Sequence, residues 1–515
     1  MRATDLPRYY NAIDILEHNL AERRHKTALH SLERDMTFQE VSDEVNQVGN
    51  ALQQLGVRFG DVVGILAPDG PEWATAFFGS IKIGAIAMGL NTLLQPAEYA
   101  YILRDSRARV LIVHETLLPV IEPLRDQHPS LAQVVVIGQP QRDTDPTYDE
   151  WIRNASTQLE TEQTHREDYC SLNYSSGTTG EPKGVLHAHK DYPLIAQLSG
   201  VNLFGLQASD RTFSVAKLFF VYGIGANLIY PWYVGASTVL YSGSPRIVTG
   251  VLEMIDRFKP TILISVPTAY VATMTLHHFA ARYDLSSIRL CLSAGEALPA
   301  SVWHAWKEKT GLEILDTIGC TESLHTFMAN RPGHIRPGSS GKPFPGYEIK
   351  LVDVDGADVP QGEIGNLMVK GESVALSYLH QYEKSRQAFR GEWLFTNDKY
   401  YVDEDGYYWS SGRADDMLKV AGLWVSPMEI ENTLMSHPIV LECAVIGESD
   451  SSALIKPKAF VCLNEGYTPS NTLIRDLLHH CAKQLATHKC PRWIEFLEQL
   501  PKTATGKIQR YKLRS

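Results

Sequence analysis

The chain has 515 residues, of which 44% are hydrophobic and 21% charged, a composition that excludes a disordered or a fibrous protein. Its 48 Lys and Arg residues against 59 Asp and Glu residues give a net charge of −11, which argues against general nucleic-acid binding because that binding needs cations on phosphates. A chain of this length can bury a large core and predicts about two to four domains.

Short apolar runs alternate with helical patterns through most of the chain. We expect buried strands and one amphipathic helix at the following positions: strands at 62–67, 110–114, 134–138, 262–265 and 290–293, and a helix at 71–84. This alternation predicts an α/β fold in which layered, mostly parallel sheets are covered by helices.

One stretch, 218–245, contains no charged residue and is long enough to span a bilayer. It also contains Asn227, Pro231 and several glycines, and its Pro-Trp-Tyr-Val-Gly run is typical of a turn. We therefore expect a buried helix followed by a buried strand, and no membrane partner.

The character of the chain changes after Arg413. An Asp-Gly pair at 405–406 predicts a hairpin turn, and a compact segment with strands near 443–447 and 459–463 and a helix near 473–485 follows. We place a domain boundary at Asp415, between a large domain at 1–414 and a small α+β domain at 415–515.

Cysteine usage and the N-terminus limit the class of protein further. The seven cysteines are odd in number and form no CxxC pair, so neither a disulfide framework nor a cysteine zinc site is indicated. The first residues carry charges and no apolar core of a secretory signal, so we expect a cytoplasmic protein.

The segment 174–184, YSSGTTGEPKG, carries the clearest chemical signal. Its glycines allow tight turns in which successive N–H groups point toward an anion, its hydroxyl groups add donors, and Lys183 adds a positive charge suited to phosphate. It is not a Walker A loop, because Lys183 is followed by Gly184 and not by Ser or Thr.

This segment closely resembles the phosphate loop of the acyl-adenylate-forming superfamily, which includes acyl- and aryl-CoA ligases, adenylation domains and luciferases. Four further motifs of that superfamily follow in its order: LSAGEALP at 292–299, DTIGCTE at 316–322, TND at 396–398 with SGRADD at 411–416, and PKTATGK at 501–507. The resemblance implies ATP, Mg²⁺ and coenzyme A as cofactor and co-substrates.

The resemblance also assigns roles to single residues. The phosphate loop comprises Ser175, Ser176, Gly177, Thr178, Thr179, Gly180 and the catalytic Lys183; the adenine side comprises Gly295, Glu296, Ile318, Gly319, Cys320 and Thr321; the ribose side comprises Asp398 and Arg413. Glu322 and Thr179 would bind Mg²⁺, for which a carboxylate is a suitable hard ligand. Because Ile318 stands where many members carry an aromatic residue, we expect the adenine to pack on an aliphatic surface.

Within the superfamily, KLFFVYGIG at 217–225 and TESLHTF at 321–327 look like the benzoate-CoA ligase group. By this resemblance the acid pocket is lined by Val221, Tyr222, Gly223, Ala294 and His325. Tyr222 would offer its ring face to an aryl group, and His325 would hydrogen-bond the carboxylate as a catalytic residue. The group usually has Ala at the position of Val221 and Met at that of Ser323, so we expect a reshaped pocket for a hydroxy- or aminobenzoate.

The resemblance implies two half-reactions. The acid carboxylate first attacks the α-phosphorus of ATP and pyrophosphate leaves, with Lys507 stabilising the reacting oxygens. The small domain then turns about the hinge Asp415 and presents a face with Gly422 near the CoA tunnel, where the thiol attacks the aryl-adenylate. The function predicted is an ATP-dependent aryl-CoA ligase for a small aromatic carboxylic acid.

Two alternatives remain open at this point. The enzyme could load the acid onto a separate carrier protein, or the chain could be a nucleotide-binding regulatory protein that has lost catalysis. Retention of Lys183, Glu322, Asp398, Arg413 and Lys507 argues against the second. Assembly as a homodimer also stays open.

Overall fold

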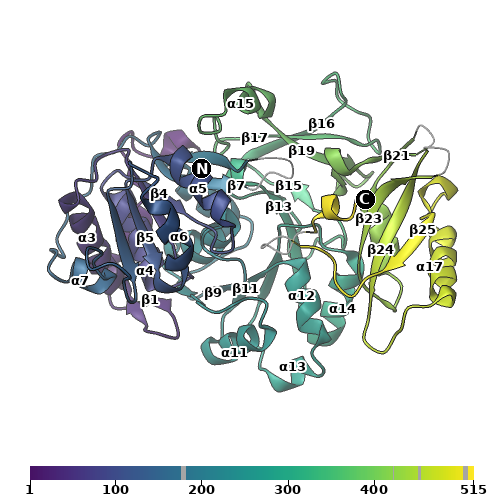
Figure 1. Ribbon diagram of the computed structural model, residues 1–515, viewed down its shortest axis with the longest axis horizontal. Coiled ribbons are helices and arrows are strands. Elements are labelled where there is room, and N and C mark those ends of the chain that lie inside the picture. The colour runs from purple at the N-terminus through teal and green to yellow at the C-terminus, as the bar shows by residue number, and fades with distance from the viewer. Residues whose placement is uncertain (176–180, 421–422, 451–453, 503–507, 515) are drawn as a thin grey trace.

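The structure is a computed structural model that describes residues 1–515 apart from 176–180, 421–422, 451–453, 503–507 and 515, and apart from the side chains of Asp415 and Trp424. The described residues form a large body and a smaller lobe made by the C-terminal part of the chain (Figure 1). The large body contains mixed and parallel sheets covered by helices, so the predicted α/β class with a separate C-terminal domain is confirmed. The boundary at residue 415 stays a prediction.

A six-stranded sheet forms one end of the large body, at the left of Figure 1. Its strands in spatial order are β6 (Gln133–Ile137), β5 (Val110–His114), β3 (Val62–Leu66), β4 (Ile86–Gly89), β7 (Tyr169–Ser175) and β8 (Lys183–Ala188). They run parallel except for the antiparallel pair of β7 and β8. Successive residues of β5 alternate between two apolar clusters, Val110 and Ile112 in one and Leu111 and Val113 in the other, so both faces of the sheet are buried.

Helices contribute residues to both of these apolar clusters. The first cluster includes residues of α3 (Phe38–Gln54) and α4 (Pro71–Lys82), and the second includes residues of α5 (Pro96–Ser106) and α6 (Leu118–Arg125). Shorter helices also contribute residues to the first cluster or pack against it: α1 (Asp14–Glu17), α2 (Leu20–Arg23), α7 (Tyr148–Arg153) and α8 (Asp191–Ile195).

A nine-stranded sheet forms the centre of the large body. Its strands in spatial order are β15 (Lys342–Pro343), β14 (Thr326–Ala329), β13 (Ile314–Gly319), β12 (Leu290–Ser293), β11 (Ile262–Ser265), β9 (Arg211–Ser214), β10 (Ser237–Val239), β1 (Thr27–His30) and β2 (Met36–Thr37). The strands from β13 to β1 are parallel, which confirms the predicted arrangement of this region.

The two faces of this sheet pack against different elements. Ile262 and Ile264 of β11 join the core shared with α3 and α4, whereas Leu263 joins a second core with four helices on the opposite face. These helices are α11 (Val248–Phe258), α12 (Pro267–Thr275), α13 (Phe279–Arg282) and α14 (Ala300–Thr310). The buried Trp306 of α14 stacks near Phe279 and Tyr270 in this layer.

The uncharged stretch at 218–245 forms α9 (Val221–Ile224), a π-helical segment at Gly225–Ile229, α10 (Tyr230–Tyr233) and then β10. Among the described residues no helix is long and apolar enough to cross a membrane. The expected helix and strand are therefore present. The turn expected in the run 231–235 is present at its end, where Gly235 has a φ of 74°, whereas Pro231 itself lies in the first turn of α10, a position that needs no N–H donor.

A third sheet lies above the central one in Figure 1. It contains β16 (Tyr347–Val352), β17 (Gly365–Gly371), β19 (Trp393–Val402), β18 (Phe389–Arg390) and β20 (Tyr408–Arg413), all antiparallel, with α15 (Tyr382–Ala388) beside it. The turn predicted at 405–406 connects β19 with β20, and Gly406 has the φ of 80° that such a turn requires.

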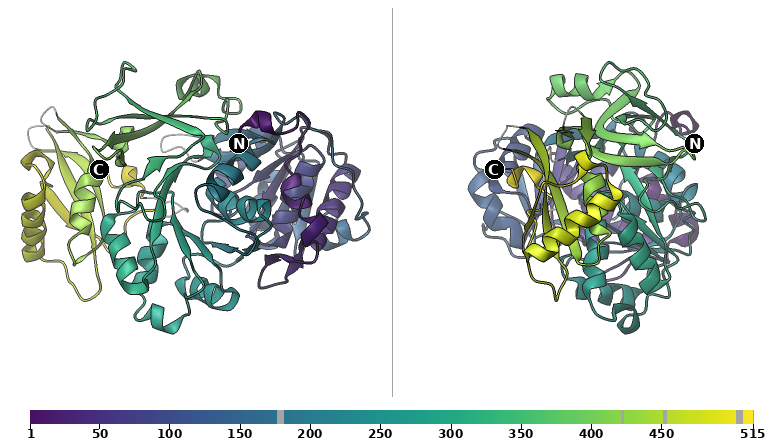
Figure 2. Two further views of the ribbon diagram at one scale, coloured as in Figure 1. Left: turned by 180° about the vertical axis from the view of Figure 1, so that it is seen from behind. Right: turned by 90° about the vertical axis from the view of Figure 1, so that its right-hand side faces the viewer.

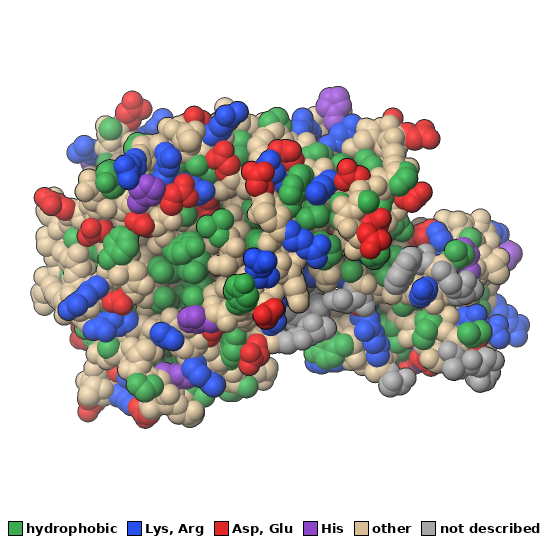
Figure 3. Space-filling view, turned by 90° about the horizontal axis from the view of Figure 1, so that it is seen from above, with side chains coloured by type: hydrophobic (Ala, Val, Ile, Leu, Met, Phe, Trp, Pro, Cys, Tyr) green, Lys and Arg blue, Asp and Glu red, His purple; other side chains and the backbone are tan. Residues whose placement is uncertain are grey.

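The C-terminal lobe has its own apolar core. It comprises the hairpin of β21 (Leu418–Val420) and β22 (Leu423–Val425), helices α16 (Pro427–Met435) and α17 (Asn471–Gln484), and the sheet of β23 (Val440–Ser449), β24 (Ile455–Leu463) and β25 (Trp493–Phe496). Figure 2 shows α17 on the outer side of the lobe, away from the large body. Figure 3 shows the lobe as a separate unit beside the large body.

Candidate active site

The base of the phosphate loop is an antiparallel pair of strands. Ser175 at the end of β7 lies opposite Lys183 at the start of β8, so the two strands hold the ends of the loop together. The predicted loop residues Ser176, Gly177, Thr178, Thr179 and Gly180 lie outside the described residues. The structure thus brings together the two ends of the predicted phosphate site.

Lys183 belongs to a cluster that spans distant parts of the sequence. Its Nζ lies 4.9 Å from the ring centroid of Tyr378, and the Tyr378 hydroxyl donates a 2.7 Å hydrogen bond to Oε1 of Glu322. Burial and the neighbouring carboxylate of Glu322 raise the pKa of Tyr378. The predicted phosphate lysine and the predicted magnesium ligand are therefore neighbours, joined by a tyrosine that the sequence did not identify.

The predicted ribose residues form a second pair. Asp398 of β19 lies opposite Arg413 of β20, and Nη1 of Arg413 donates to Oδ1 of Asp398 at 2.9 Å. Burial raises the pKa of Cys320, and the carboxylates of Glu322 and Asp398 raise it further, so both carboxylates lie near this thiol. These side chains come from several elements but converge on one region.

The predicted adenine residues follow the carboxyl ends of two neighbouring strands. Gly295 and Glu296 follow β12 directly after the predicted pocket residue Ala294, and Ile318 and Gly319 end the adjacent strand β13. Gly295 has a φ of 89°, which a side chain would strain, and a Cβ at Gly319 would lie 2.4 Å from the carbonyl oxygen of His325. Ligands of parallel α/β sheets bind at such carboxyl ends.

Cys320 and Thr321 continue from β13 into a short 3₁₀ helix at Thr321–Ser323. This helix also carries Glu322, so the adenine side and the metal side share one turn of chain. The hydroxyl of Ser323 is buried and donates to the carbonyl oxygen of His325 at 2.7 Å. The expectation that Ser323 reshapes the acid pocket with its hydroxyl is wrong, because this hydroxyl holds the turn.

The predicted acid pocket begins where the chain enters α9. Val221 and Tyr222 are half-buried at the start of this helix. A Cβ at Gly223 would lie 2.0 Å from the carbonyl oxygen of Lys217, so only glycine fits there. The hydroxyl of Tyr222 donates to the carbonyl oxygen of Ser265 at 3.3 Å, which holds the ring in place.

His325 lies between two tyrosines. Its ring centroid is 5.6 Å from that of Tyr222 and 4.7 Å from that of Tyr230. Nδ1 lies 2.5 Å from the Tyr230 hydroxyl, and Nε2 lies 3.3 Å from the carbonyl oxygen of Tyr222. Burial lowers the pKa of His325 to about 3, so the imidazole is neutral at neutral pH. In the tautomer that satisfies both contacts, Tyr230 donates to Nδ1 and Nε2 donates to the carbonyl group.

A buried carboxyl group lies beside this pocket. Asp316 of β13 is 3% exposed, and its Oδ2 accepts a hydrogen bond from the N–H of Leu298 at 3.3 Å. Burial raises the pKa of Asp316 to about 8. Asp316 also raises the pKa of the Tyr222 phenol, after burial itself, so the two side chains are close. Apart from its place in the motif at 316–322, nothing in the sequence pattern singles out Asp316.

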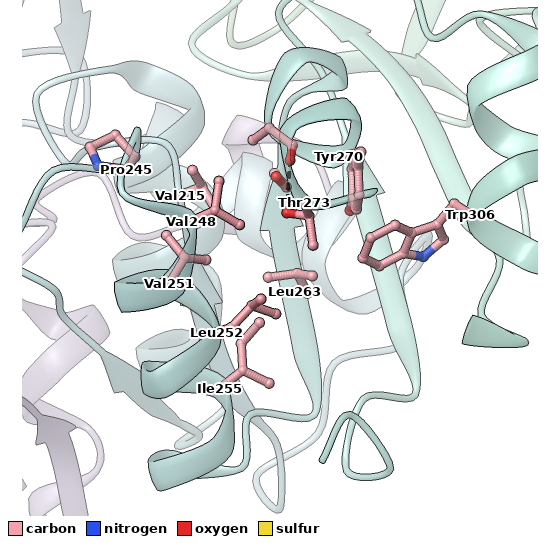
Figure 4. A pocket seen from close by; sticks show the side chains of 12 residues that line it. Val215, Pro245, Val248, Val251, Leu252, Ile255, Leu263, Tyr270, Thr273 and Trp306 are labelled. Atoms are coloured by element: carbon pink, nitrogen blue, oxygen red, sulfur yellow. Dashed lines mark hydrogen bonds between the residues drawn. The ribbon is translucent and has the colours of Figure 1, made fainter. Parts of the chain in front are cut away.

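A small apolar cavity of about 20 Å³ lies on the face of the central sheet that carries α11, α12 and α14. Figure 4 shows side chains of α11 and α12, among them Val251 and Tyr270, directed toward one another around it. An engineered cavity that binds benzene has about 150 Å³, so this cavity cannot hold an aryl acid. Ser265 lines the cavity and also accepts the Tyr222 hydroxyl, so the cavity lies behind the wall of the predicted acid pocket.

The structure describes the predicted hinge and the predicted C-terminal site residues only in part. Asp415 lies in a short 3₁₀ helix at Ala414–Asp416, directly after β20, and its side chain is outside the description. Gly422 and Lys507 lie outside the described residues. Lys502 and Ile508 form an antiparallel bridge, so the two ends of the segment that contains Lys507 are adjacent.

Comparison with known proteins bears on this arrangement. Residues 16–379 match the family model described as AMP-binding enzyme, and residues 429–507 match the AMP-binding enzyme C-terminal domain. The benzoate-CoA ligase of Thauera aromatica is 44% identical over 517 aligned positions, covering 100% of this chain and 97% of that protein. The 4-hydroxybenzoate-CoA/benzoate-CoA ligase of Rhodopseudomonas palustris is 40% identical, covering 98% of this chain and 94% of that protein.

A solved structure is more similar still. The crystal structure of the anthranilate CoA ligase AuaEII in complex with anthranoyl-AMP superimposes with a TM-score of 0.97 at 62% identity, covering 100% of this chain and 98% of that one. The family models and these relatives agree with the motif order and with the converging side chains. The chain therefore belongs to the AMP-binding enzyme family, the acyl-adenylate-forming superfamily, and within it to the aryl-CoA ligases that resemble benzoate-CoA ligase.

Proposed function

We propose that this protein is an ATP-dependent aryl-CoA ligase whose acid is an aminobenzoate, with anthranilate as the best-supported substrate. The reaction is the activation of the acid as its aryl-AMP, with release of pyrophosphate, followed by transfer of the aryl group to the thiol of coenzyme A. The single observation that carries the choice of acid is the full-length similarity, at 62% identity, to an anthranilate CoA ligase in complex with anthranoyl-AMP.

The chemistry of the predicted pocket is consistent with this acid. The pocket residues Val221, Tyr222, Gly223, Ala294 and His325 include no ionised group at neutral pH, since burial keeps His325 neutral. In anthranilate the ortho amino group donates a hydrogen bond to its own carboxylate, so it needs no dedicated acceptor from the protein. The ring can pack on the face of Tyr222, and bulky Val221 limits the length of the pocket.

His325 has a defined place in this proposal. Its Nδ1 accepts from Tyr230, which fixes the ring, while the contact of Nε2 with the Tyr222 carbonyl is longer, at 3.3 Å. The N–H at Nε2 could therefore exchange this carbonyl for the carboxylate of the acid. A neutral donor suits this task because the carboxylate must stay ionised and nucleophilic.

The nucleotide lies, in this proposal, across the cluster of Lys183, Glu322, Asp398 and Arg413. Asp398 and Arg413 would bind the ribose, with Arg413 already oriented by its ion pair. Lys183 and the phosphate loop would bind the phosphates. Among the described residues no group of three or more His, Cys, Asp or Glu side chains could hold a metal alone, so Mg²⁺ would be shared between Glu322 and the phosphates of ATP, whose negative charge it would offset.

The second half-reaction needs a different face of the small domain. Lys507 would act in adenylation, and the segment around Gly422 would face the adenylate when the thiol attacks. A rotation about Asp415 connects the two arrangements. The named relatives are CoA ligases, which supports coenzyme A as acceptor over a carrier protein. A cytoplasmic location, where ATP and coenzyme A are abundant, also belongs to this proposal.

A substrate panel tests the proposal. Pyrophosphate release and thioester formation are measured with anthranilate, benzoate, 4-hydroxybenzoate and palmitate, each with and without coenzyme A. We expect kcat/KM for anthranilate to exceed that of the others by about 10-fold or more, the discrimination that a few pocket contacts provide. Palmitate turned over faster than every aryl acid would overturn the assignment.

Two variants, measured with the same substrates, test whether the predicted pocket wall determines the choice of acid. Val221→Ala should improve kcat/KM for acids with larger ring substituents by about 10- to 200-fold relative to anthranilate, because it removes two methyl groups from the wall. Val251→Ala enlarges the separate apolar cavity in the α11 layer and serves as the matched control. It should leave the order of substrates unchanged.

A further inference from the structure

His187 is a fully buried histidine of strand β8 that the predicted reaction does not use. Successive side chains of a strand alternate between its two faces, so Lys183, Val185 and His187 share one face of β8. Lys183 lies over the ring of Tyr378, and Val185 pairs with Tyr378 in an isolated β-bridge. His187 is the third residue of this row, and its contacts lead to the turn that carries Glu322.

The imidazole of His187 lies between a carbonyl oxygen and a carboxylate. Nε2 lies 2.8 Å from the carbonyl oxygen of Thr321, which is 134 residues away in the chain. Nδ1 lies 3.1 Å from Oδ2 of Asp191, the first residue of α8, which is 4% exposed. The same Oδ2 accepts the N–H of Ala188 at 2.9 Å, so the carboxylate itself is fixed to the chain.

These contacts determine where the ring carries its hydrogen. A carbonyl oxygen only accepts hydrogen bonds, so Nε2 of His187 must donate to Thr321. Nδ1 and Oδ2 of Asp191 then share one proton, and Nε2 keeps its hydrogen whichever of these two atoms holds it. Asp191 therefore fixes both the rotation of the imidazole and the protonation of Nε2, as a carboxylate does for other oriented histidines.

The turn that His187 contacts is under backbone strain. Leu324 follows the 3₁₀ helix Thr321–Ser323 with a φ of 64° and a ψ of −33°, an unfavourable conformation for leucine. Such a conformation persists only where the surroundings hold it. All three carbonyl oxygens of Thr321–Ser323 accept hydrogen bonds from other segments of the chain, and that of Thr321 accepts the one from β8.

The His187 hydrogen bond differs from the other link between the lysine strand and the predicted metal ligand. That other link runs through the Tyr378 hydroxyl, which donates to Oε1 of Glu322. A metal ion bound by Glu322 would compete with this hydroxyl for the carboxylate. The His187 link uses the backbone carbonyl group of Thr321 instead, so it leaves both carboxylate oxygens available to the metal.

We propose that His187 is a positioning residue that fixes the turn carrying Glu322 relative to the strand carrying Lys183. Asp191 orients the imidazole, and the Thr321 carbonyl oxygen is the group that the imidazole holds. The inference rests on the proposed function, in which Glu322 binds Mg²⁺ beside the phosphates of ATP. It adds what keeps that carboxylate in place when the metal replaces the tyrosine hydroxyl.

Two amide substitutions separate the two contacts of the imidazole. Asparagine places its amide near the position of Nδ1, and glutamine places its amide near that of Nε2. His187→Asn therefore keeps the contact with Asp191 and loses that with Thr321, whereas His187→Gln still reaches the Thr321 carbonyl oxygen. His189→Asn is the matched control, because His189 is equally buried and its Nδ1 accepts the N–H of Ala12, away from the predicted site.

Binding of ATP is measured by isothermal titration calorimetry without acid or coenzyme A, once with Mg²⁺ and once with EDTA. We expect His187→Asn to raise Kd for MgATP about tenfold, the lower end of the effect of losing an outer partner of a metal site, and to leave Kd in EDTA within about threefold. His187→Gln and His189→Asn should stay within about threefold of the wild type in both conditions. In the Glu322→Ala background, His187→Asn should add no more than about twofold, because the carboxylate that it positions is gone.

Asp191→Asn tests the orienting carboxylate. Its amide oxygen must accept the Ala188 N–H, so a neutral His187 would carry its hydrogen at Nδ1 and turn a bare Nε2 toward the Thr321 carbonyl oxygen. We expect the same tenfold increase, approximately, in Kd for MgATP as in His187→Asn. The double variant should bind MgATP no more weakly than His187→Asn alone, because both changes remove one contact.

The outcomes decide the two claims separately. A wild type that shows this pattern of MgATP binding but turns over none of the aryl acids would contradict the proposed substrate and support the inference. Three results, each in a folded protein, would overturn the inference: unchanged MgATP binding in His187→Asn, an equal loss of affinity with and without Mg²⁺, or no recovery in His187→Gln.

Discussion

Replacing Asp316 by Asn should stabilise the protein, and increasingly so as the pH rises. The Asp316 carboxyl is buried at the edge of the predicted acid pocket, and among the described residues its Oδ1 has no hydrogen-bond partner. An amide oxygen can accept the Leu298 N–H as the carboxyl oxygen of Asp316 does. The amide nitrogen can face Ser293, which lies opposite in the strand register.

The direction in which the stability changes with pH follows from the raised pKa of Asp316. In the folded state Asp316 holds its proton up to a pKa of about 8, whereas in the unfolded chain its pKa is the ordinary value of 3.8. The stability that this group contributes is complete at low pH and is lost as the pH rises toward 8, at about 1.4 kcal/mol per pH unit. Asparagine does not titrate, so its advantage over aspartate should grow by at most about 4 kcal/mol between pH 4.5 and pH 7.5.

Differential scanning calorimetry of both proteins across this pH range measures the effect. The difference in Tm between Asp316→Asn and wild type should increase steadily from pH 4.5 to pH 7.5. A constant difference, or one that decreases with pH, would refute the reasoning, because it would mean that Asp316 is ionised in the folded protein at neutral pH.

Asp210 provides a control, because its contribution to stability should change with pH in the opposite direction. It is also buried, but hydrogen bonds from Arg289 and Thr261 outweigh the effect of burial and lower its pKa. Its contribution to stability is present above the unfolded pKa and is lost as the pH falls. Asp210→Asn should therefore lower Tm at pH 7.5 and lower it less at the acidic end of the range.

Three further predictions concern the site. Gly225→Ala should raise KM for the aryl acid by about tenfold and leave KM for ATP unchanged in steady-state kinetics, because a Cβ there would lie 2.3 Å from Cδ2 of His325 and displace the imidazole. Arg413→Gln should raise KM for ATP by about tenfold while Tm stays within a degree or two, since its ion pair with Asp398 is partly exposed and such pairs stabilise folding by about 0–1 kcal/mol. Asp415→Pro should spare one half-reaction and impair the other when both are measured separately, because proline fixes φ near −65° and restricts the rotation.

Each of these three predictions has an outcome that would contradict it. Unchanged acid kinetics in Gly225→Ala would remove His325 from the acid pocket. An effect of Arg413→Gln on the acid rather than on ATP would place the ribose elsewhere. Equal rates of both half-reactions in Asp415→Pro would show that the hinge is not at this residue.

Much of the fold could be predicted because its signals are local. The strands expected at 110–114, 262–265 and 290–293 have these bounds in the structure, since each is an apolar run ended by a turn or a polar residue. The predicted nucleotide residues converge because the carboxyl ends of parallel strands meet at one edge of a sheet. Asp398 and Arg413 are adjacent because a hairpin connects their strands.

The remaining features of the site could not be predicted from the sequence, because they depend on contacts between distant parts of the chain. Tyr378 connects Lys183 with Glu322, but nothing in its own neighbourhood indicates that role. Tyr230 orients His325 although the two residues are 95 positions apart in the sequence, and nothing in the pattern around either one indicates this contact. Ser323 was expected in the pocket wall, but the chain turns at that point so that its hydroxyl points back to a carbonyl group. Side-chain direction at irregular turns is set by packing, which a local pattern does not encode.

The formation of an aryl-adenylate is the central claim, and an isotope measurement tests it most directly. Anthranilate labelled with ¹⁸O in both carboxylate oxygens is turned over with ATP and coenzyme A, and the products are analysed by mass spectrometry. Attack of the carboxylate on the α-phosphorus, followed by thiol attack on the carbonyl carbon, transfers one labelled oxygen to AMP and leaves the other in the thioester. Label in AMP at one atom per turnover is the predicted result. Label in inorganic phosphate with formation of ADP would contradict the account, because it would mean that the acid is activated as an acyl phosphate.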